Sequence, residues 1–221
     1  MSFSIGVDEA GRGPVIGSMF IAAYAIEDEL LDELKKLGVK DSKLLTKGKR
    51  EELYPKLMEI GKAEFVEINA EEITTLMRKR ISLNEIEAIK AASAIEKLQK
   101  TLGEVTAIYV DSPDPVPSKF GIRLRKYFKP KGRLVCENKA DFRYPVVGAA
   151  SIVAKVLRDN SIEEIKKLVN HDIGTGYSHD ERTIAFLKKN ISRKDVEKHV
   201  RHTWATAKNL KQTQVKLADF G

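Results

Sequence analysis

The chain has 221 residues, 42% of them hydrophobic and 32% charged, which is enough apolar material for a folded core and excludes general disorder. It has a single cysteine, no apolar run near the roughly 20 residues that span a bilayer, and no signal-peptide pattern at its start; we therefore exclude a disulfide framework, a multi-cysteine zinc site and a membrane helix, and expect a soluble cytoplasmic protein. The net charge is +7, and residues 188–216, with nine Lys or Arg against two Asp or Glu, carry all of it.

Hydrophobic periodicity predicts strands and helices that alternate along the chain. Apolar and alternating runs predict strands at residues 3–7, 19–26, 63–68, 105–110 and 133–136. Three- and four-residue spacing predicts helices at residues 27–37, 82–102, 119–128, 144–169, 183–189 and 195–210. Thr46 is a candidate cap for a further helix, which Pro55 should kink or shorten. This alternation indicates an α/β fold with a helical C-terminal part.

Acidic residues follow three of the predicted strands. Asp8 and Glu9 follow the first strand, Asp111 follows the fourth, and Asp141 comes shortly after the fifth. Because open α/β sheets place their sites beyond the carboxyl ends of strands, we expect these carboxylates to gather there. Mg²⁺ or Mn²⁺ would offset their mutual repulsion, and two such ions could clamp the attacking and leaving oxygens of a phosphoryl displacement.

Each acid also has a plainer interpretation, as a loop residue or a helix cap. Adjacent residues of a strand point to opposite faces, so Asp8 and Glu9 share one site only if the pleat ends there, which the glycine turn that follows permits. That turn, Gly11-Arg12-Gly13, is either an ordinary tight turn or a ligand-binding loop, in which glycine lets the backbone approach a ligand and arginine forks onto a phosphate.

These residues resemble the ribonuclease HII family, the type 2 ribonucleases H, in its archaeal subtype. The resemblance is carried, in family order, by the runs DEAGRGP (8–14), DSK (41–43), YVD (109–111), KAD (139–141), AASIVAK (149–155) and GTGY (174–177). It implies a ribonuclease H-like α/β fold, a mixed central sheet flanked by helices, over residues 1–177. A helical C-terminal extension that clamps an RNA–DNA hybrid, the expected substrate, would follow over residues 178–212. A flexible tail would follow over residues 213–221.

The resemblance implies an endonuclease that cleaves the RNA strand of RNA–DNA hybrids and single ribonucleotides embedded in duplex DNA, leaving 3′-hydroxyl and 5′-phosphate ends. Such an activity belongs to ribonucleotide excision repair and DNA replication. The resemblance assigns one or two Mg²⁺ or Mn²⁺ ions to Asp8, Glu9, Asp111 and Asp141, one ion activating water and the other stabilising the departing 3′ oxygen. A monomer is the expected state.

The resemblance also assigns the reading of the ribonucleotide to Gly11, Arg12, Gly13 and Tyr177. Backbone groups of the glycine turn would hydrogen-bond the 2′-hydroxyl, the group that separates RNA from DNA. The tyrosine ring would stack on the next deoxyribose, where a second 2′-hydroxyl would clash. The alternative for Tyr177 is a partly buried loop aromatic.

Four further residues are candidates for supporting roles. Lys43 and Lys139 are either phosphate contacts or solvated lysines. Ser151 and Lys155 are four residues apart on a predicted helix, so they share a face and orient acids or phosphates, unless Ser151 simply packs. We expect Trp204, within the basic segment, to anchor that segment to the core rather than to stack on a base.

Two rival functions are a strand-transfer or resolvase-type nuclease of the same fold and a non-catalytic nucleic-acid-binding module. The glycine turn and Tyr177 argue against the first, and the four intact acids argue against the second. The basic surplus of residues 188–216 indicates either contact with a polyanion, nucleic acid foremost, or a solvated helix face.

The last eight residues resemble the motif by which many replication and repair enzymes bind the sliding clamp, PCNA. Gln214 is followed by Leu217 and then by Phe220 at three-residue steps. A short turn would put Leu217 and Phe220 on one side as apolar anchors, with Gln214 hydrogen-bonding nearby. Gly221 stands where the usual motif has a second aromatic residue, so the match is incomplete. The alternative is a frayed tail, or packing of these side chains on the enzyme's own surface.

Overall fold

A computed structural model describes residues 1–39 and 45–218, which form two compact units. The first unit comprises Met1–Ala10, Phe20–Glu67 and Leu83–Leu157, within the described residues. The second comprises Gly11–Met19, Ile68–Ser82 and the described residues from Arg158 onward. Domain boundaries at residues 177 and 212 stay a prediction. In the part of the chain that the structure describes, no helix has the length and apolar character needed to cross a membrane.

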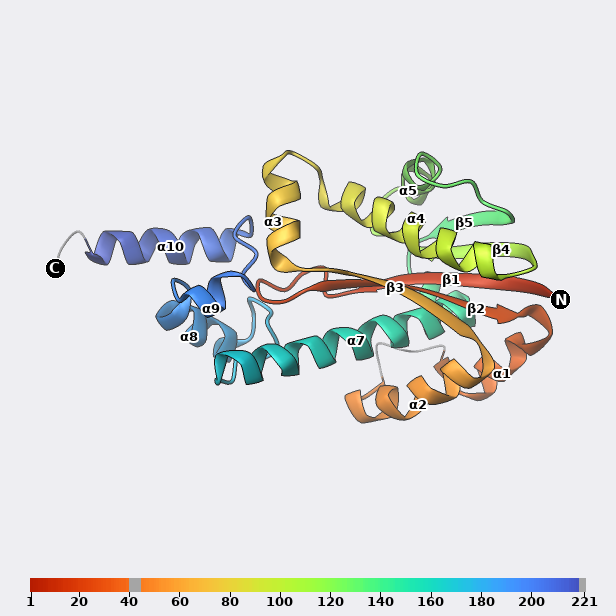
Figure 1. Cartoon of the computed structure of the whole chain (residues 1–221), viewed down its shortest axis with the longest axis horizontal. Coiled ribbons are helices and arrows are strands. Elements are labelled where there is room, and N and C mark those ends of the chain that lie inside the picture. Colours follow the sequence, from red (N-terminus) through yellow and green to blue (C-terminus); the bar gives the residue numbers. More distant parts are fainter. Residues whose placement is uncertain (40–44, 219–221) are drawn as a thin grey trace. The chain divides into compact units, whose positions relative to one another are not determined.

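A mixed five-stranded sheet, with the strand order β3-β2-β1-β4-β5, forms the centre of the first unit (Figure 1). Its strands are β1 (Ser2–Ala10), β2 (Met19–Glu27), β3 (Lys62–Ile68), β4 (Glu104–Asp111) and β5 (Arg133–Glu137). β1 runs antiparallel to β2 and parallel to β4, and β4 runs parallel to β5. The carboxyl ends of β1, β4 and β5 therefore lie at the same end of the sheet.

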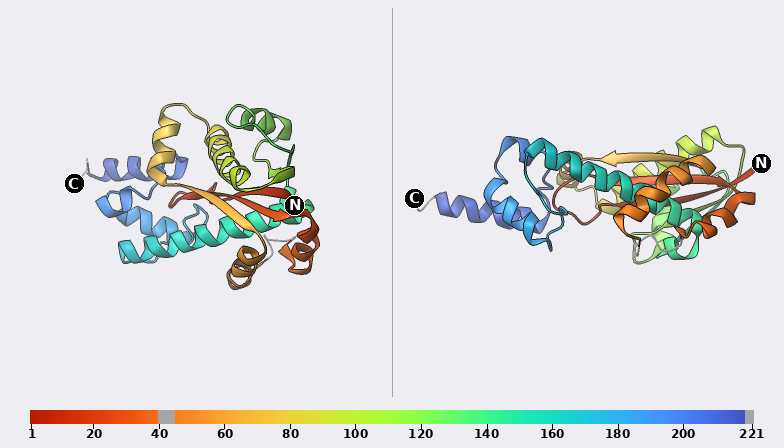
Figure 2. Two further views of the ribbon diagram at one scale, coloured as in Figure 1. Left: turned by 45° about the vertical axis from the view of Figure 1, so that its right-hand side comes forward. Right: turned by 90° about the horizontal axis from the view of Figure 1, so that it is seen from below.

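Helices cover both faces of this sheet (Figures 1 and 2). α4 (Leu83–Thr101) and α5 (Pro117–Leu124) lie on one face. The other face carries α1 (Leu31–Lys36), which follows the short η1 (Asp28–Leu30), together with α2 (Lys47–Ile60) and the first half of α7 (Pro145–Val169). The short α6 (Ala140–Arg143) connects β5 to α7. This arrangement confirms the predicted α/β class with a mixed sheet flanked by helices.

The first turn of α7 packs directly on β1 at Gly6. A Cβ at Gly6 would lie 2.2 Å from the carbonyl oxygen of Val146, so only glycine permits this approach. Further along α7, Ala150 and Val153 are fully buried in the same hydrophobic core. The close packing brings the middle of α7, including Ser151, to the strand that carries the first acids.

The second unit has a hydrophobic core of its own. Its helices are α3 (Ala70–Arg78), the second half of α7, α8 (Glu181–Asn190), α9 (Lys194–Glu197) and α10 (Ala205–Ala218). Val15 and Ile16 pack there with Phe186 and Val200. Trp204 packs against the same cluster, which agrees with its predicted role as an anchor.

Three elements differ from the prediction. The helix predicted over 195–210 is two helices, α9 and α10, because the chain between them pairs with the loop after β1 through an Ile16–Val200 bridge. Pro55 does not end α2; it lies on the exposed side of the helix, where water can satisfy the carbonyl group that loses its partner. The missed helix α3 begins with Asn69, whose side chain accepts a hydrogen bond from the N–H of Glu72 (2.8 Å), a capping signal that the sequence does contain.

Candidate active site

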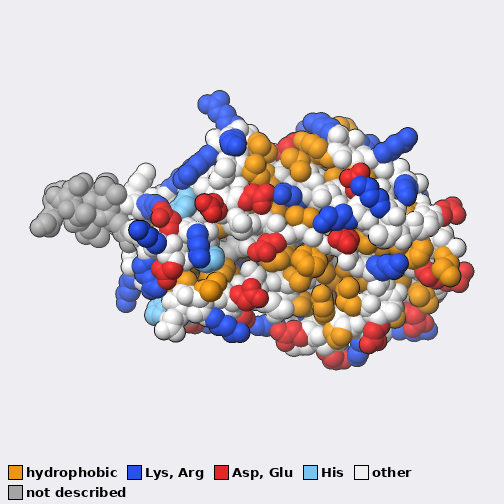
Figure 3. Space-filling view, viewed as in Figure 1, with side chains coloured by type: hydrophobic (Ala, Val, Ile, Leu, Met, Phe, Trp, Pro, Cys, Tyr) orange, Lys and Arg blue, Asp and Glu red, His pale blue; other side chains and the backbone are white. Residues whose placement is uncertain are grey.

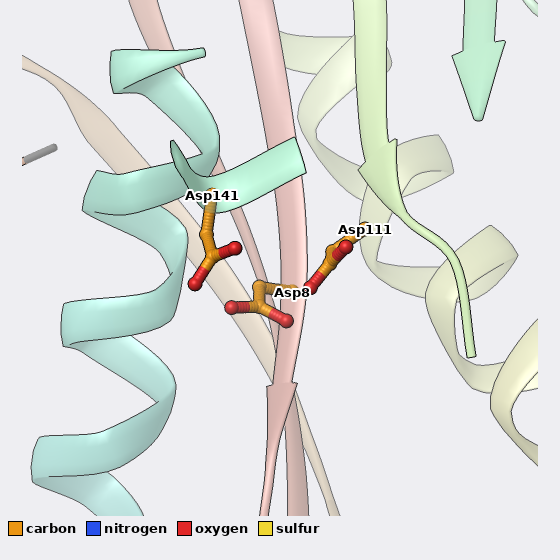
Figure 4. A group of neighbouring side chains, drawn as sticks. All are labelled: Asp8, Asp111 and Asp141. Carbon is orange, nitrogen blue, oxygen red and sulfur yellow. The ribbon is translucent and has the colours of Figure 1, made fainter. Parts of the chain in front are cut away.

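Three aspartate side chains from separate elements meet at the end of the sheet where β1, β4 and β5 have their carboxyl ends (Figure 4). Asp8 lies near the end of β1, Asp111 is the last residue of β4, and Asp141 lies in α6. Carboxylate oxygens of all three lie within 4.8 Å of one another. The register of β1 and β4 explains why Asp8 and Asp111 lie close together, because Val7 pairs with Val110 and the two aspartates are the next residues of these parallel strands. The structure thus brings three of the four predicted acids together.

The carboxyl group of Asp8 is held from two directions. The residue is 5% exposed and accepts hydrogen bonds from the N–H of Glu9 (2.8 Å) and from the hydroxyl of Ser151. Lys155 in turn donates to the Oγ of Ser151 (2.7 Å). Burial, followed by the negative charges of Glu9 and Asp111, raises the pKa of Asp8 well above the usual value for aspartate. Ser151 and Lys155 therefore form a hydrogen-bonded chain that ends at Asp8; that they orient this acid for a reaction stays a prediction.

A turn between β5 and α6 positions the other two aspartates. Lys139 has a φ of 58°, a left-handed conformation that costs a non-glycine residue on the order of 1 kcal/mol. The turn allows the N–H of Ala140 to donate to Oδ1 of Asp111 (2.9 Å). It also begins the helix from which Asp141, 2% exposed, points toward Asp8 (Figure 4). The side chain of Lys139 is exposed, and its contact with phosphate stays a prediction.

Glu9 is not a member of the three-aspartate cluster. β1 continues to Ala10, so the pleat does not end at Asp8 as expected, and adjacent residues of the strand point to opposite faces. Glu9 nevertheless lines one small cavity together with Asp8 and Asp111. Its charge contributes to the raised pKa of Asp8, so the two carboxyl groups are within electrostatic reach of each other.

The glycine turn and Tyr177, both in the second unit, lie against each other. A Cβ on Gly13 would lie 3.4 Å from Cε1 of the Tyr177 ring. The N–H groups of Val15 and Ile16 donate to the carbonyl of Gly176 (2.8 and 3.2 Å). Two segments that are more than 150 residues apart in the sequence therefore form one local structure.

Two buried side chains hold the Tyr177 loop in place: Arg158, which follows the AASIVAK run in the family resemblance but was given no role there, and Thr183, which sequence analysis missed. The guanidinium carbon of Arg158 lies 5.1 Å from the centre of the Tyr177 ring, and Arg158 donates a hydrogen bond to the carbonyl of Thr175. The hydroxyl of Thr183, fully buried, accepts from the N–H of Gly176 (3.0 Å). These contacts depend on tertiary structure, although the family run that ends at Tyr177 could have directed attention to its neighbours.

Gly11 is required by the shape of the turn. Its φ is 83°, and a Cβ there would lie 2.7 Å from the carbonyl oxygen of Ser18, so no other residue fits without strain. Arg12 is partly exposed and Gly13 is exposed, which leaves the outer side of the turn open to a ligand. Lys43, the remaining predicted contact, lies outside the described residues.

Comparison with known proteins agrees with the family resemblance found in the sequence. The family model described as Ribonuclease HII matches residues 5–207. A ribonuclease HII from Methanococcus maripaludis is 44% identical over 208 residues, covering 93% of this chain and 86% of that protein. The chain belongs to the ribonuclease HII family.

Solved structures agree with this assignment. The crystal structure of ribonuclease H2 from Pyrococcus horikoshii matches with a TM-score of 0.83 and 37% identity, covering 96% of this chain and 98% of that one. The structure of the PCNA:RNase HII complex from Archaeoglobus fulgidus matches with a TM-score of 0.83 and 40% identity, covering 95% and 97%. The predicted ribonuclease H-like fold is confirmed, and the chain, as a member of this family, is a hydrolase with ribonuclease H endonuclease activity.

Glu87 of α4 is a further acid near the site that the sequence analysis did not single out. It is 2% exposed and lines the same small cavity as Asp8, Glu9 and Asp111. Burying a carboxyl group is costly unless neighbouring groups compensate. Its position beside Ile86, on the side of a predicted helix that faces the sheet, was the signal that could have found it.

The cluster of Asp8, Asp111 and Asp141 fits a hard divalent cation. Carboxylate oxygens are the ligands that Mg²⁺ and Mn²⁺ prefer, and ligands around one Mg²⁺ at 2.0–2.1 Å lie up to about 4 Å apart. Oxygens of Asp8, Asp111 and Asp141 within 4.8 Å need only small shifts to share such an ion. Burial is the main cause of the raised pKa of Asp8, and the negative charges of Glu9 and Asp111, which a cation would offset, add to it.

Proposed function

We propose that this enzyme cleaves the RNA strand of RNA–DNA hybrids and the backbone at a single ribonucleotide embedded in duplex DNA, by metal-dependent hydrolysis that leaves 3′-hydroxyl and 5′-phosphate ends. The observation that carries the proposal is the meeting of Asp8, Asp111 and Asp141 at the carboxyl end of the sheet. Membership of the ribonuclease HII family supports the choice of nucleic acid.

Each acidic residue has a proposed place in the reaction. Asp8, Glu9, Asp111 and Asp141 would hold one or two Mg²⁺ or Mn²⁺ ions. When bound, such ions supply an activated water and offset the charge on the leaving 3′ oxygen. Ser151, backed by Lys155, would keep the Asp8 carboxylate in one orientation, so that the donor oxygens are already arranged before substrate arrives.

The glycine turn and Tyr177 would read the ribonucleotide. N–H groups on the open side of the turn would donate to the 2′-hydroxyl, which only the ribonucleotide has. The ring of Tyr177 would stack on the sugar of the following deoxynucleotide. Their mutual contact through Gly13 supports a shared role, because one nucleotide junction would then meet both groups.

Three duplexes of identical sequence test this function: a DNA duplex with one ribonucleotide, an RNA–DNA hybrid and an all-DNA duplex. We expect the first two to be cut with Mg²⁺, no cutting in EDTA, and an intact all-DNA duplex. The upstream product should be extended by a polymerase without prior phosphatase treatment, and the downstream product should be ligated without a kinase. Cutting of the all-DNA duplex would favour the resolvase-type rival, and no cutting at all would favour the binding module.

The basic surplus provides a proposed contact with the phosphate backbone. On the face shown in Figure 3, Lys and Arg side chains, with histidines among them, are spread over the region of α8 and α9. Lys189, Lys194, Lys198 and Lys208 are all exposed. Deleting the extension would remove Val196 from the core, so the charges are better tested by substitution.

Replacing Lys189, Lys194, Lys198 and Lys208 together with glutamine should weaken binding to the duplex and flatten its salt dependence. Each lysine that no longer neutralises a phosphate lowers the slope of log affinity against log salt by about 0.9, so the four together would change it by about 3.6. The measurement is fluorescence anisotropy in Ca²⁺ over a range of salt. The same four positions changed to arginine keep the charge and should keep the slope; an unchanged slope in the glutamine variant means that these lysines face only solvent.

We also propose that the C-terminal residues bind a sliding clamp. The related protein from Archaeoglobus fulgidus was solved as a PCNA:RNase HII complex. In this chain the backbone of α10 continues to Ala218 and so includes Gln214 and Leu217, whereas Phe220 lies outside the described residues. Leu217 and Phe220 would be the apolar anchors and Gln214 the polar contact.

Calorimetry with the clamp of the source organism tests the clamp proposal. The natural sequence should bind, and the double variant Leu217→Ala/Phe220→Ala should not, since it removes both anchors. Asp219→Ala, which changes a side chain between them, is the matched control and should bind normally. Absence of heat at roughly 100 µM clamp, which corresponds to affinity weaker than about −5.5 kcal/mol, would overturn the proposal.

A further inference from the structure

Arg201 is a basic residue of the C-terminal extension that does not face solvent. Its side chain is fully buried, although composition alone counts it with the surplus of positive charge. Its guanidinium donates to three backbone carbonyls: Nε to Gly17 (3.0 Å), Nη1 to Arg12 (2.9 Å) and Nη2 to Gly11 (2.6 Å). Two of these three acceptors belong to the glycine turn.

Trp204 also forms a hydrogen bond with the glycine turn. Its indole Nε1 donates to the carbonyl of Gly13 (3.1 Å), and the guanidinium carbon of Arg201 lies 5.0 Å from the centre of its ring. The backbone of this segment is fixed as well, because the N–H of Arg201 donates to the carbonyl of Val15 (2.9 Å). Three successive carbonyls, those of Gly11, Arg12 and Gly13, are therefore held from one side.

Because the peptide bond is planar, fixing these carbonyl groups also fixes the orientation of the backbone N–H groups in the glycine turn. Described peptide bonds are all trans, so each C=O points opposite to the N–H of the following residue. The carbonyl of Gly11 shares a peptide with the N–H of Arg12, and the carbonyl of Arg12 shares one with the N–H of Gly13. With both carbonyls directed at Arg201, both N–H groups point away from it, and Gly13 itself is exposed.

We propose that Arg201 is a positioning residue that presents the N–H groups of Arg12 and Gly13 to the 2′-hydroxyl of the ribonucleotide. This inference rests on the proposed reading of the ribonucleotide by the turn. The buried positive charge beside two carbonyl oxygens also polarises their peptides, which strengthens the N–H groups as donors. Trp204 assists by fixing the third carbonyl.

A purely structural arginine would behave differently from a positioning one. Its loss would lower thermal stability and reduce binding to every duplex alike. Loss of a positioning residue removes the preference for a ribonucleotide while sequence-independent contacts with phosphate persist, because those contacts come from other side chains. The ratio of affinities for two duplexes therefore separates the two roles.

The test compares Arg201→Gln with Arg125→Gln, which removes the same charge from an exposed arginine of the first unit. Anisotropy in Ca²⁺ gives the affinity for a DNA duplex with one ribonucleotide and for the all-DNA duplex of the same sequence. For Arg201→Gln we expect the affinity ratio to fall toward one, the all-DNA affinity to stay within twofold, and kcat/KM on the single-ribonucleotide duplex to fall at least tenfold. Arg125→Gln should match the unsubstituted enzyme in all three.

Arg201→Lys keeps the positive charge but replaces the planar fork of donors by a single ammonium group, so it provides the same test should Arg201→Gln fail to fold; the expected loss of preference is about two- to fivefold. A preference retained by folded Arg201→Gln, or by Arg201→Lys where Arg201→Gln does not fold, overturns the role of Arg201 and leaves the proposed function standing. Absence of any ribonucleotide preference in the unsubstituted enzyme overturns the reading function itself.

Discussion

Asp8→Asn is expected to lower kcat/KM on the single-ribonucleotide duplex by at least 10²–10³-fold, about the effect of removing a group that stabilises the transition state. Asp111→Asn should act similarly. Each change removes one negative charge from the cluster that would hold the cations but leaves the basic surface intact. Affinity for the duplex, measured in Ca²⁺, should therefore survive. Near-normal cleavage by either variant would remove that residue from the catalytic set.

Asp8→Asn should also raise the thermal stability of the protein in EDTA at neutral pH. Burial, with the nearby acids, raises the pKa of Asp8, so its charged form opposes folding above that pKa and the opposition is relieved as pH falls. Asp28 is the matched control: burial alone would raise its pKa, but hydrogen bonds from Ser4, Thr106 and Ser2 outweigh it and lower the pKa. Its charged form favours folding until pH falls through that lowered pKa, so Asp28→Asn should lower the melting temperature and leave activity unchanged.

Tyr177→Ala should reduce cleavage at a single embedded ribonucleotide by about tenfold or more, while affinity for the duplex changes little. A tenfold loss corresponds to about 1.4 kcal/mol of transition-state stabilisation, and the ring lies against the glycine turn that would read the 2′-hydroxyl. Phosphate contacts carry most of the affinity. The measurement pairs kcat/KM in Mg²⁺ with anisotropy in Ca²⁺ on the same duplex.

Tyr177→Phe is the matched control, because it keeps the ring that packs near Arg158 and removes only the hydroxyl. We expect it to retain most of the activity. Equal losses of cleavage and binding in Tyr177→Ala would identify the residue as structural, and a Phe variant as impaired as the Ala variant would transfer the role from the ring to the hydroxyl.

Sequence patterns predicted the positions of Asp8 and Asp111 well, because the position of each depends on the strand that contains it. Asp8 lies near the end of one apolar strand and Asp111 at the end of another, and parallel register alone then places them side by side. Asp141 required the left-handed residue Lys139 to turn the chain. That conformation is uncommon for lysine, and no local pattern announces it.

The residues that support the site were harder to predict, since their roles depend on partners far along the chain. Arg201 contacts the turn across about 190 residues, and composition counted it only as a positive charge. Its segment also leaves the predicted helix to form those bonds. Glu87 lies on a helix whose amphipathic spacing was evident, but only the folded sheet shows that it shares a cavity with Asp8.

Because Gly6 has no side chain, β1 and α7 touch backbone to backbone beside the acid cluster. The hydroxyl of Ser151, on α7, donates to Asp8, on β1, so this hydrogen bond depends on the spacing between helix and strand. A single methyl group at position 6 would widen that spacing and lengthen the path from Lys155 through Ser151 to Asp8. A residue without any functional group therefore belongs among those on which the proposed reaction would depend.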